Sequence, residues 1–159
     1  IVDLITRDFP PTLSTLWKKR TTLKHLLKIG LRNRGKTPVG EIDATDRGLS
    51  CLPMITSWPE DGGPFITLPL VYTEPVHKGS PNLGMYRIQR HSNDKLGLHF
   101  QIGKGAGYHL YEAEEANQPL PVSIFVGGSP ATILSAIAPL PENMPELLLA
   151  SMVLGQKME

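Results

Sequence analysis

The sequence has little cysteine, few aromatic residues and almost no net charge. Cys51 is the single cysteine among 159 residues, which excludes an internal disulfide and is typical of a reducing compartment, so we expect a cytoplasmic protein. Sixteen Lys and Arg face 15 Asp and Glu, and a net charge of +1 gives no general attraction to nucleic acid. No apolar run reaches the roughly 18 residues of a membrane helix, and no secretory leader is visible.

What is present is a globular composition with many turns. Hydrophobic residues make up 40% of the chain and charged residues 19%, which is enough to form about one domain with a real core. Fifteen glycines and 15 prolines predict short strands and loops around a site. The chain starts at Ile1 without methionine and ends just after an apolar helix. We therefore expect it to be a piece of a longer protein.

The N-terminal part is predicted to be helical. From residue 12 to residue 33 leucines recur at helical spacing and lysines and arginines populate the other side, which favours a solvated helix face over a binding patch. Residues 34–43 break this pattern and form a connector. We predict two parts, a helical segment with linker over residues 1–40 and a main domain over residues 41–159.

Short strands dominate the main domain, which predicts a mainly β, α+β fold. Residues 64–74 are β-like, although Pro69 restricts them to an edge or irregular strand. Residues 84–91 and 95–102 alternate around a short turn and predict an antiparallel hairpin. One face of this hairpin is apolar, with Leu96, Leu98, Phe100 and Ile102, and the other carries Arg87, Gln89, His99 and Gln101.

The C-terminal half predicts helices between further strands. The glycine-rich residues 103–107 precede a short helix over residues 109–117, and residues 120–128 form a buried strand. Ser129 and Pro130 are suited to begin the next helix. A last helix is opened by Pro145, with Glu146 in its first turn.

The candidate site residues each allow two interpretations. Arg87 is either paired with a carboxylate of the protein or holds the anion of a substrate or cofactor through two hydrogen bonds. Asn82 suits a turn, His99 a strand and Glu146 a helix start, but together they supply the amide, imidazole and carboxylate that Mn²⁺ or Mg²⁺ accepts. Lys104 and its neighbouring glycine amides suit a phosphate, although the spacing matches no nucleotide motif.

Two other chemistries are disfavoured by the residues. No Cys/His pair has the spacing of a zinc site. Cys51 has no activating partner near it in the sequence, which argues against a nucleophilic thiol.

Three blocks carry a resemblance to a known family. "PNLGMYRIQR", "GLHFQIGKGAGYH" and "LPVSIFVGGSPATILSAIAPLPENMPELLLASMVLG" occur in this order, and residues 38–159 resemble the UbiD family of prenylated-flavin-dependent decarboxylases. The resemblance implies a split β-barrel of the flavin-binding type with flanking helices, set within a larger enzyme.

The resemblance also implies roles for individual residues. Asn82, His99 and Glu146 would bind manganese, which grips the flavin phosphate, and carbonyls of residues 135–138 would hold a potassium ion. Arg87 would hold the substrate carboxylate as the catalytic arginine. The residues expected to line the prenylated FMN are Asn82, Met85, Tyr86, Arg87, His99, Phe100, Gln101, Lys104, Gly105 and Glu146.

The implied reaction is non-oxidative decarboxylation of an aromatic acid such as a 4-hydroxybenzoate precursor of ubiquinone or menaquinone. A flavin prenyltransferase would supply the cofactor, a polyprenyl substrate would bring peripheral contact with membranes, and the full-length protein would form homo-oligomers. The acid that protonates the product in this family lies beyond residue 159, so this chain alone is expected to be inactive.

Two other classes of function stay open. One is a split-barrel module that binds plain FMN and serves a flavin reductase or a storage role. The other is a non-catalytic assembly domain, which would bind neither flavin nor manganese.

Overall fold

The computed structural model describes residues 27–32, 35, 38–101, 103–140 and 144–158. Over these residues the chain forms an α+β structure with short antiparallel strands and three α-helices. The strands are β1 (Phe65–Ile66), β2 (Pro69–Thr73), β3 (Asn82–Met85), β4 (Ile88–Arg90), β5 (Leu96–Leu98) and β6 (Val122–Val126). The helices are α4 (Gly105–Glu115), α5 (Pro130–Ile137) and α6 (Glu146–Leu154), preceded by the 3-10 turns Pro38–Gly40, Thr45–Arg47 and Leu49–Cys51.

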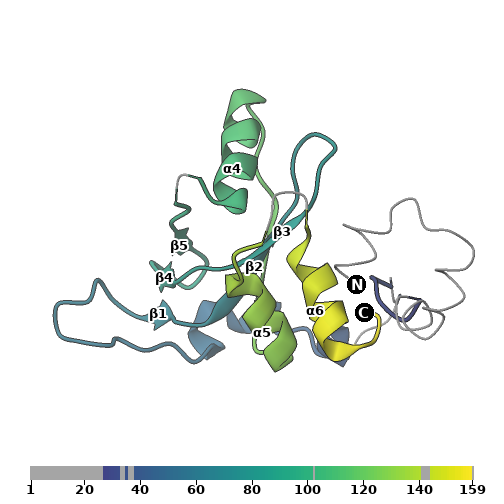
Figure 1. Cartoon of the computed structure of the whole chain (residues 1–159). Coiled ribbons are helices and arrows are strands. Elements are labelled where there is room, and N and C mark those ends of the chain that lie inside the picture. The colour runs from purple at the N-terminus through teal and green to yellow at the C-terminus, as the bar shows by residue number, and fades with distance from the viewer. Residues whose placement is uncertain (1–26, 33–34, 36–37, 102, 141–143, 159) are drawn as a thin grey trace, which may run out of the picture.

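The strands form two three-stranded antiparallel sheets. One has the order β1-β4-β5 and the other β3-β2-β6. In the second sheet Val71 lies opposite Gly84 of β3 and Ile124 of β6. Helices α5 and α6 lie side by side and contact β3, whereas α4 contacts β3 and β2 above them (Figure 1). Strand β3 is therefore in contact with all three of these helices.

The core lies where the two sheets approach each other. Ile66, Val71 and Ile88 form its buried centre. Leu96, Leu98 and Phe100 pack against this centre, which confirms the predicted apolar face of the hairpin, while Ile102 lies outside the described residues. The predicted hairpin itself is confirmed by the pairing of β4 with β5, in which Ile88 lies opposite Leu98.

The single strand predicted over residues 84–91 is wrong, because the chain changes sheets within it. Residues 82–85 belong to β3 and residues 88–90 to β4, in the other sheet. The Tyr86 ring folds back over Gly84, where a Cβ atom would lie 2.3 Å from the ring. Only a glycine leaves room for this bend. The side chains therefore keep alternating along residues 84–91, but the backbone of residues 82–85 and that of residues 88–90 pair in different sheets.

Two other strand predictions are corrected. Residues 64–74 are broken into β1 and β2 as expected of an irregular strand, but β2 is the central strand of its sheet, not an edge. Pro69 is tolerated because it is the first residue of β2. The strand predicted to be buried over residues 120–128 contains β6, and all five of its residues are exposed. Within the described residues β6 pairs with β2 alone and leaves its outer edge free.

The helix signals are confirmed, with one shift. The Ser129 hydroxyl accepts a hydrogen bond from the backbone N–H of Thr132 at 3.2 Å, and Pro130 is the first residue of α5. Glu146 begins α6, with Pro145 at the cap position. Helix α4 begins at Gly105, four residues earlier than predicted, so the glycine-rich stretch supplies its first turn.

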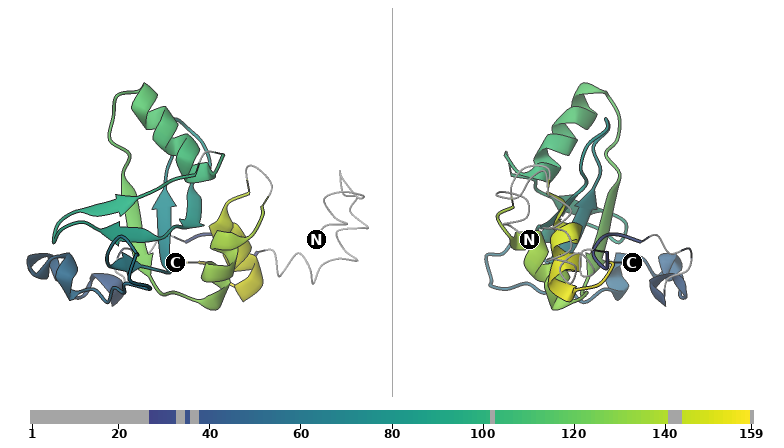
Figure 2. Two further views of the ribbon diagram at one scale, coloured as in Figure 1. Left: turned by 90° about the vertical axis from the view of Figure 1, so that its left-hand side faces the viewer. Right: turned by 45° about the vertical axis from the view of Figure 1, so that its right-hand side comes forward.

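The N-terminal helix predicted over residues 12–33 lies mostly outside the described residues, and the described part, residues 27–32, forms a turn and a bridge instead. Leu31 pairs with Met158, and the backbone N–H of Arg32 donates to the Met158 carbonyl at 2.7 Å. Figure 2 shows this part of the chain beside α6.

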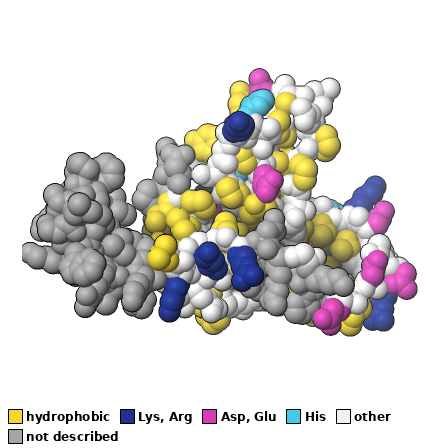
Figure 3. Space-filling model, turned by 90° about the vertical axis from the view of Figure 1, so that its right-hand side faces the viewer, with side chains coloured by type: hydrophobic (Ala, Val, Ile, Leu, Met, Phe, Trp, Pro, Cys, Tyr) yellow, Lys and Arg dark blue, Asp and Glu magenta, His cyan; other side chains and the backbone are white. Residues whose placement is uncertain are grey.

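Among the described residues, no helix has the length and apolar character needed to cross a membrane. Apolar side chains are exposed on the face drawn in Figure 3.

Candidate functional site

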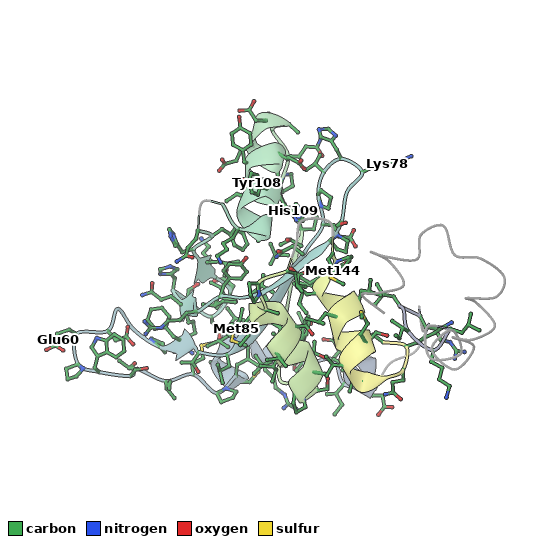
Figure 4. The ribbon with its side chains drawn as sticks, viewed as in Figure 1. Glu60, Lys78, Met85, Tyr108, His109 and Met144 are labelled. Carbon is green, nitrogen blue, oxygen red and sulfur yellow. The ribbon has the colours of Figure 1, made fainter. Side chains whose placement is uncertain are left out.

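A large cavity opens at the start of β3, between the ends of the three helices. Its volume is about 1180 Å³, which is enough for a ligand of cofactor size. It is lined by β3 with the loop before it, the first residues of α4, the C-terminal end of α5 with the residues after it, and the start of α6. Figure 4 labels four of the lining residues, with Tyr108 and His109 on α4 and Met85 and Met144 below them in this view.

The structure brings nearly all predicted site residues to this cavity. The members that line it are Asn82, Met85, Tyr86, Arg87, His99, Gln101, Lys104, Gly105 and Glu146. Phe100 does not line it. Its ring turns toward the core and meets the Tyr86 ring edge-on, with the ring centroids 5.2 Å apart. Phe100 therefore supports Tyr86 from behind and is not in a position to flank a ligand.

Asn82 and Glu146 both line the cavity, and Glu146 contacts Leu83, the residue after Asn82. The Glu146 carboxylate accepts a hydrogen bond from the Leu83 backbone N–H at 3.0 Å, which fixes the start of α6 against β3. The Asn82 side-chain nitrogen is buried and has no hydrogen-bond partner within the described part of the chain. Such an unsatisfied buried group is rare and is typical of a position that a ligand completes.

Gly105 gives Asn82 the space it occupies. A Cβ atom on Gly105 would lie 2.2 Å from the Asn82 side-chain oxygen, so no larger residue fits there without moving the amide. Helix α4 begins at this point, with Lys104 at its cap position, and both residues line the cavity. The N-terminal end of an eleven-residue helix and a lysine together favour an anion.

The donor set suits a hard cation as well as an anion. Asn82 offers an amide oxygen and Glu146 a carboxylate, the ligands that Mn²⁺ and Mg²⁺ accept, and His99 lines the same cavity. Over the described ranges, no three His, Cys, Asp or Glu side chains form a metal cluster. A metal here would therefore depend on the Asn82 amide and on oxygen atoms of phosphate or water, and the residues present fit that arrangement.

Tyr86 is kept protonated beside these groups. Burial raises the pKa of its hydroxyl, the Asn82 side chain and the Ala106 backbone oppose this rise, and the Glu146 charge adds to it. Because a neutral phenol can donate a hydrogen bond, Tyr86 provides a donor near the Asn82 and Glu146 side chains.

His109 and Glu112 were not predicted and also line the cavity. His109 lies 2.8 Å from the Thr73 hydroxyl through its Nδ1 atom. Burial lowers the pKa of His109, although Glu112, the Ser80 backbone and Glu146 partly counteract it, so the imidazole is neutral. One oxygen of Glu112 is buried without a partner in the described residues. The spacing of three residues on α4 is the signal that could have joined them to the site.

Arg87 has a protein partner that was not identified from the sequence. Its guanidinium forms an ion pair with Asp61 and lies over the Phe65 ring, 3.5 Å from the ring centroid. The Trp58 ring is 5.1 Å away. The interpretation of Arg87 as paired with a carboxylate of the protein is confirmed, and Arg87 also lines the cavity. Gln89, predicted on the same face, turns away from the cavity and donates to the Gly62 carbonyl.

The fold is an α+β domain with antiparallel sheets, and its cavity is lined by an amide, a carboxylate, an imidazole and a lysine. The UbiD family model for the 3-octaprenyl-4-hydroxybenzoate carboxy-lyase Rift-related domain matches residues 32–159. The chain belongs to this family.

Named relatives agree with this assignment. The chain is 53% identical over 148 residues to a 4-hydroxybenzoate decarboxylase subunit from Chlamydia pneumoniae, covering 93% of this chain and 25% of that protein. The closed form of vanillic acid decarboxylase from Sedimentibacter hydroxybenzoicus matches with a TM-score of 0.73 and 26% identity, over 92% of this chain and 33% of that chain. An evolved dimeric form of the UbiD-class enzyme HmfF from Pelotomaculum thermopropionicum, in complex with prFMN, matches with a TM-score of 0.68 and 25% identity. This match covers 88% of this chain and 34% of that chain. This chain thus spans about a quarter of the length of its curated relatives.

The contact between Gly105 and Asn82 predicts a loss of ligand binding when Gly105 is changed to alanine. The new methyl group must displace the Asn82 amide, so we expect flavin and Mn²⁺ affinity to fall about 10- to 100-fold. Gly105 is the first residue of α4, so the higher helix propensity of alanine adds at most about 1 kcal/mol and offsets part of the cost of moving the amide. Flavin and metal content per protein, with thermal unfolding, checks this. Glu114→Ala at an exposed position of α4 is the control, and unchanged affinity in G105A would contradict the role of Asn82.

Proposed function

We propose that this chain is the cofactor-binding portion of a non-oxidative decarboxylase that acts on an aromatic acid, such as a 4-hydroxybenzoate, through prenylated FMN. Membership of the UbiD family carries this proposal. The names of relatives support it, because one belongs to a 4-hydroxybenzoate decarboxylase and one solved neighbour holds prFMN. The cavity, its oxygen donors and its basic helix start agree with a phosphate-bearing cofactor.

Within this proposal the cavity residues divide into three tasks. Asn82 and Glu146, joined by His99, would hold Mn²⁺ against the cofactor phosphate, with Lys104 and the Gly105 amide on the anionic side. Carbonyls of residues 135–138, three of which line the cavity, are the proposed ligands of a potassium ion. Met85, Tyr86 and Gln101 would line the ring system. When bound, prenylated FMN supplies the electron sink for the pair released as carbon dioxide leaves.

Arg87 is the proposed catalytic residue, because it is the cation of the cavity wall that adjoins aromatic rings. Its guanidinium would orient the substrate carboxylate and stabilise its charge through paired hydrogen bonds. A proton must replace the lost carboxyl group. We propose that the donor lies outside residues 1–159, so that this chain alone binds but does not turn over.

The finer assignments follow the same proposal. We propose that the two sheets are parts of a split barrel that the longer protein completes, with residues 1–40 as a separate helical segment. A flavin prenyltransferase would supply the cofactor, and the longer protein would act as a homo-oligomer in the cytoplasm. A role in ubiquinone or menaquinone synthesis, with membrane contact through a polyprenyl substrate, is proposed from the octaprenyl acid in the family's name.

The test is decarboxylation by the full-length protein that carries this sequence. Co-expression with a flavin prenyltransferase, followed by assays with 4-hydroxybenzoate and related aromatic acids, should give carbon dioxide release that depends on Mn²⁺ and on the prenyltransferase. Protein made without the prenyltransferase is the control. A plain FMN spectrum and reductase activity, with no carbon dioxide from any acid, would overturn the proposal in favour of a flavin-reductase module.

A further inference from the structure

The loop over residues 57–64 makes the contacts that decide where Arg87 lies. It begins and ends at the bridge between Ile55 and Phe65, whose backbone groups exchange hydrogen bonds of 2.8 and 3.1 Å. Gln89 donates to the Gly62 carbonyl, and the Arg90 backbone N–H donates to the Pro64 carbonyl at 3.0 Å. The loop is thus tied to β4, directly after Arg87.

Asp61 is held in place inside this loop. Its backbone N–H donates to the Trp58 carbonyl at 3.0 Å, and one side-chain oxygen accepts from the Ser57 backbone N–H at 3.3 Å. The Asp61 side chain is 4% exposed, whereas that of Arg87 is 38% exposed. A buried carboxylate requires a partner, and the partner here is a guanidinium that extends to the cavity.

Two aromatic rings also lie against the Arg87 guanidinium. The guanidinium lies over Phe65 and near Trp58, at 3.5 and 5.1 Å from the ring centroids. Stacking on rings together with an ion pair restricts an arginine more than either contact alone. A restrained guanidinium loses less conformational freedom when it binds a carboxylate. Its orientation is already fixed before the ligand binds, which favours affinity.

We propose that Asp61 is a positioning residue that, with Trp58 and Phe65, holds the Arg87 guanidinium for the carboxylate of an aromatic acid. This inference rests on the proposed function and deepens it. The 57–64 loop thereby belongs to the acid-binding side of the site, although residues 58 and 61 do not line the cavity itself. Asp61 neutralises part of the positive charge on Arg87, which by itself would weaken the attraction for a carboxylate. Asp61 therefore favours binding by fixing the orientation of the guanidinium.

The experiment measures binding of benzoate, an inert aromatic carboxylate, to the flavin-loaded full-length protein. We expect Asp61→Ala to raise the Kd for benzoate about 10- to 100-fold, the loss expected when a charge-assisted hydrogen bond is misaligned, while flavin content stays unchanged. Asp61→Glu should recover most of this loss. Glu60→Ala is the matched control, because Glu60 is the adjacent acidic residue and points away from the site at the tip of the loop (Figure 4).

A double-mutant cycle separates positioning from a direct contact. If Asp61 acts through Arg87, Asp61→Ala should not weaken benzoate binding further in an Arg87→Ala background. Additive losses, or tighter benzoate binding by D61A or D61N, would overturn the inference. Absence of flavin and benzoate binding in the wild-type protein would instead overturn the proposed function.

Discussion

Arg87→Ala should abolish decarboxylation by the full-length enzyme, with kcat/KM reduced about a thousandfold or more. The variant removes the guanidinium that we assign to the substrate carboxylate, and no neighbouring lysine can replace its forked donors. Arg87→Lys should recover little of the activity for the same reason. Carbon dioxide release from 4-hydroxybenzoate is the measurement, with flavin content as the internal reference. Wild-type rates in R87A would exclude the assigned role.

The same substitution also affects folding, and this effect must be separated from the loss of chemistry. Removing Arg87 leaves the Asp61 carboxylate, 4% exposed, without its cation, which should cost about 1–3 kcal/mol of unfolding free energy. The double variant Arg87→Ala with Asp61→Ala removes both charges and should recover most of that stability while staying inactive. Recovery of activity in the double variant would show that R87A had failed by misfolding.

Glu146→Gln should remove Mn²⁺ and the cofactor with little effect on the fold. A glutamine oxygen can still accept the hydrogen bond of the Leu83 N–H, so we expect less than about 1 kcal/mol of lost stability. The negative charge that a metal requires is gone, and affinity for Mn²⁺ should fall at least about a hundredfold. Metal analysis and flavin absorbance of purified E146Q check this.

Glu146→Ala is the matched comparison for this prediction. It loses the charge and also leaves the buried Leu83 N–H without a partner, so it should lose both ligands and about 1–3 kcal/mol of stability. Full Mn²⁺ and flavin content in E146Q would contradict the metal assignment, whatever the behaviour of E146A.

Features that depend on a few neighbouring residues could be predicted from the sequence. Ser129 with Pro130 and Pro145 with Glu146 begin helices where they were expected, because capping is decided within one turn. The β4–β5 hairpin has its apolar face on the core for a similar reason. Several candidate site residues lie at these helix starts or next to this hairpin, and they line one cavity.

Features that depend on distant segments could not be predicted in this way. Arg87 and its partner Asp61 are 26 residues apart, and the local pattern identifies a charge that needs an anion without identifying the anion. The change of sheet at residues 86–87 depends on Tyr86 lying over Gly84, which alternation of side chains does not encode. Phe100 was assigned to the flavin from the family resemblance, although the alternation of its strand already placed it on the core side.

The exposed strand β6 has a practical consequence for work with this chain in isolation. Its outer edge leaves backbone donors and acceptors unpaired within the described residues, along Val-Ser-Ile-Phe-Val, a run without charge or proline. Bare edges of this kind invite strand pairing between molecules and aggregation. Concentrated samples should therefore be handled as prone to self-association, and a gatekeeper such as Ile124→Lys would improve their solubility.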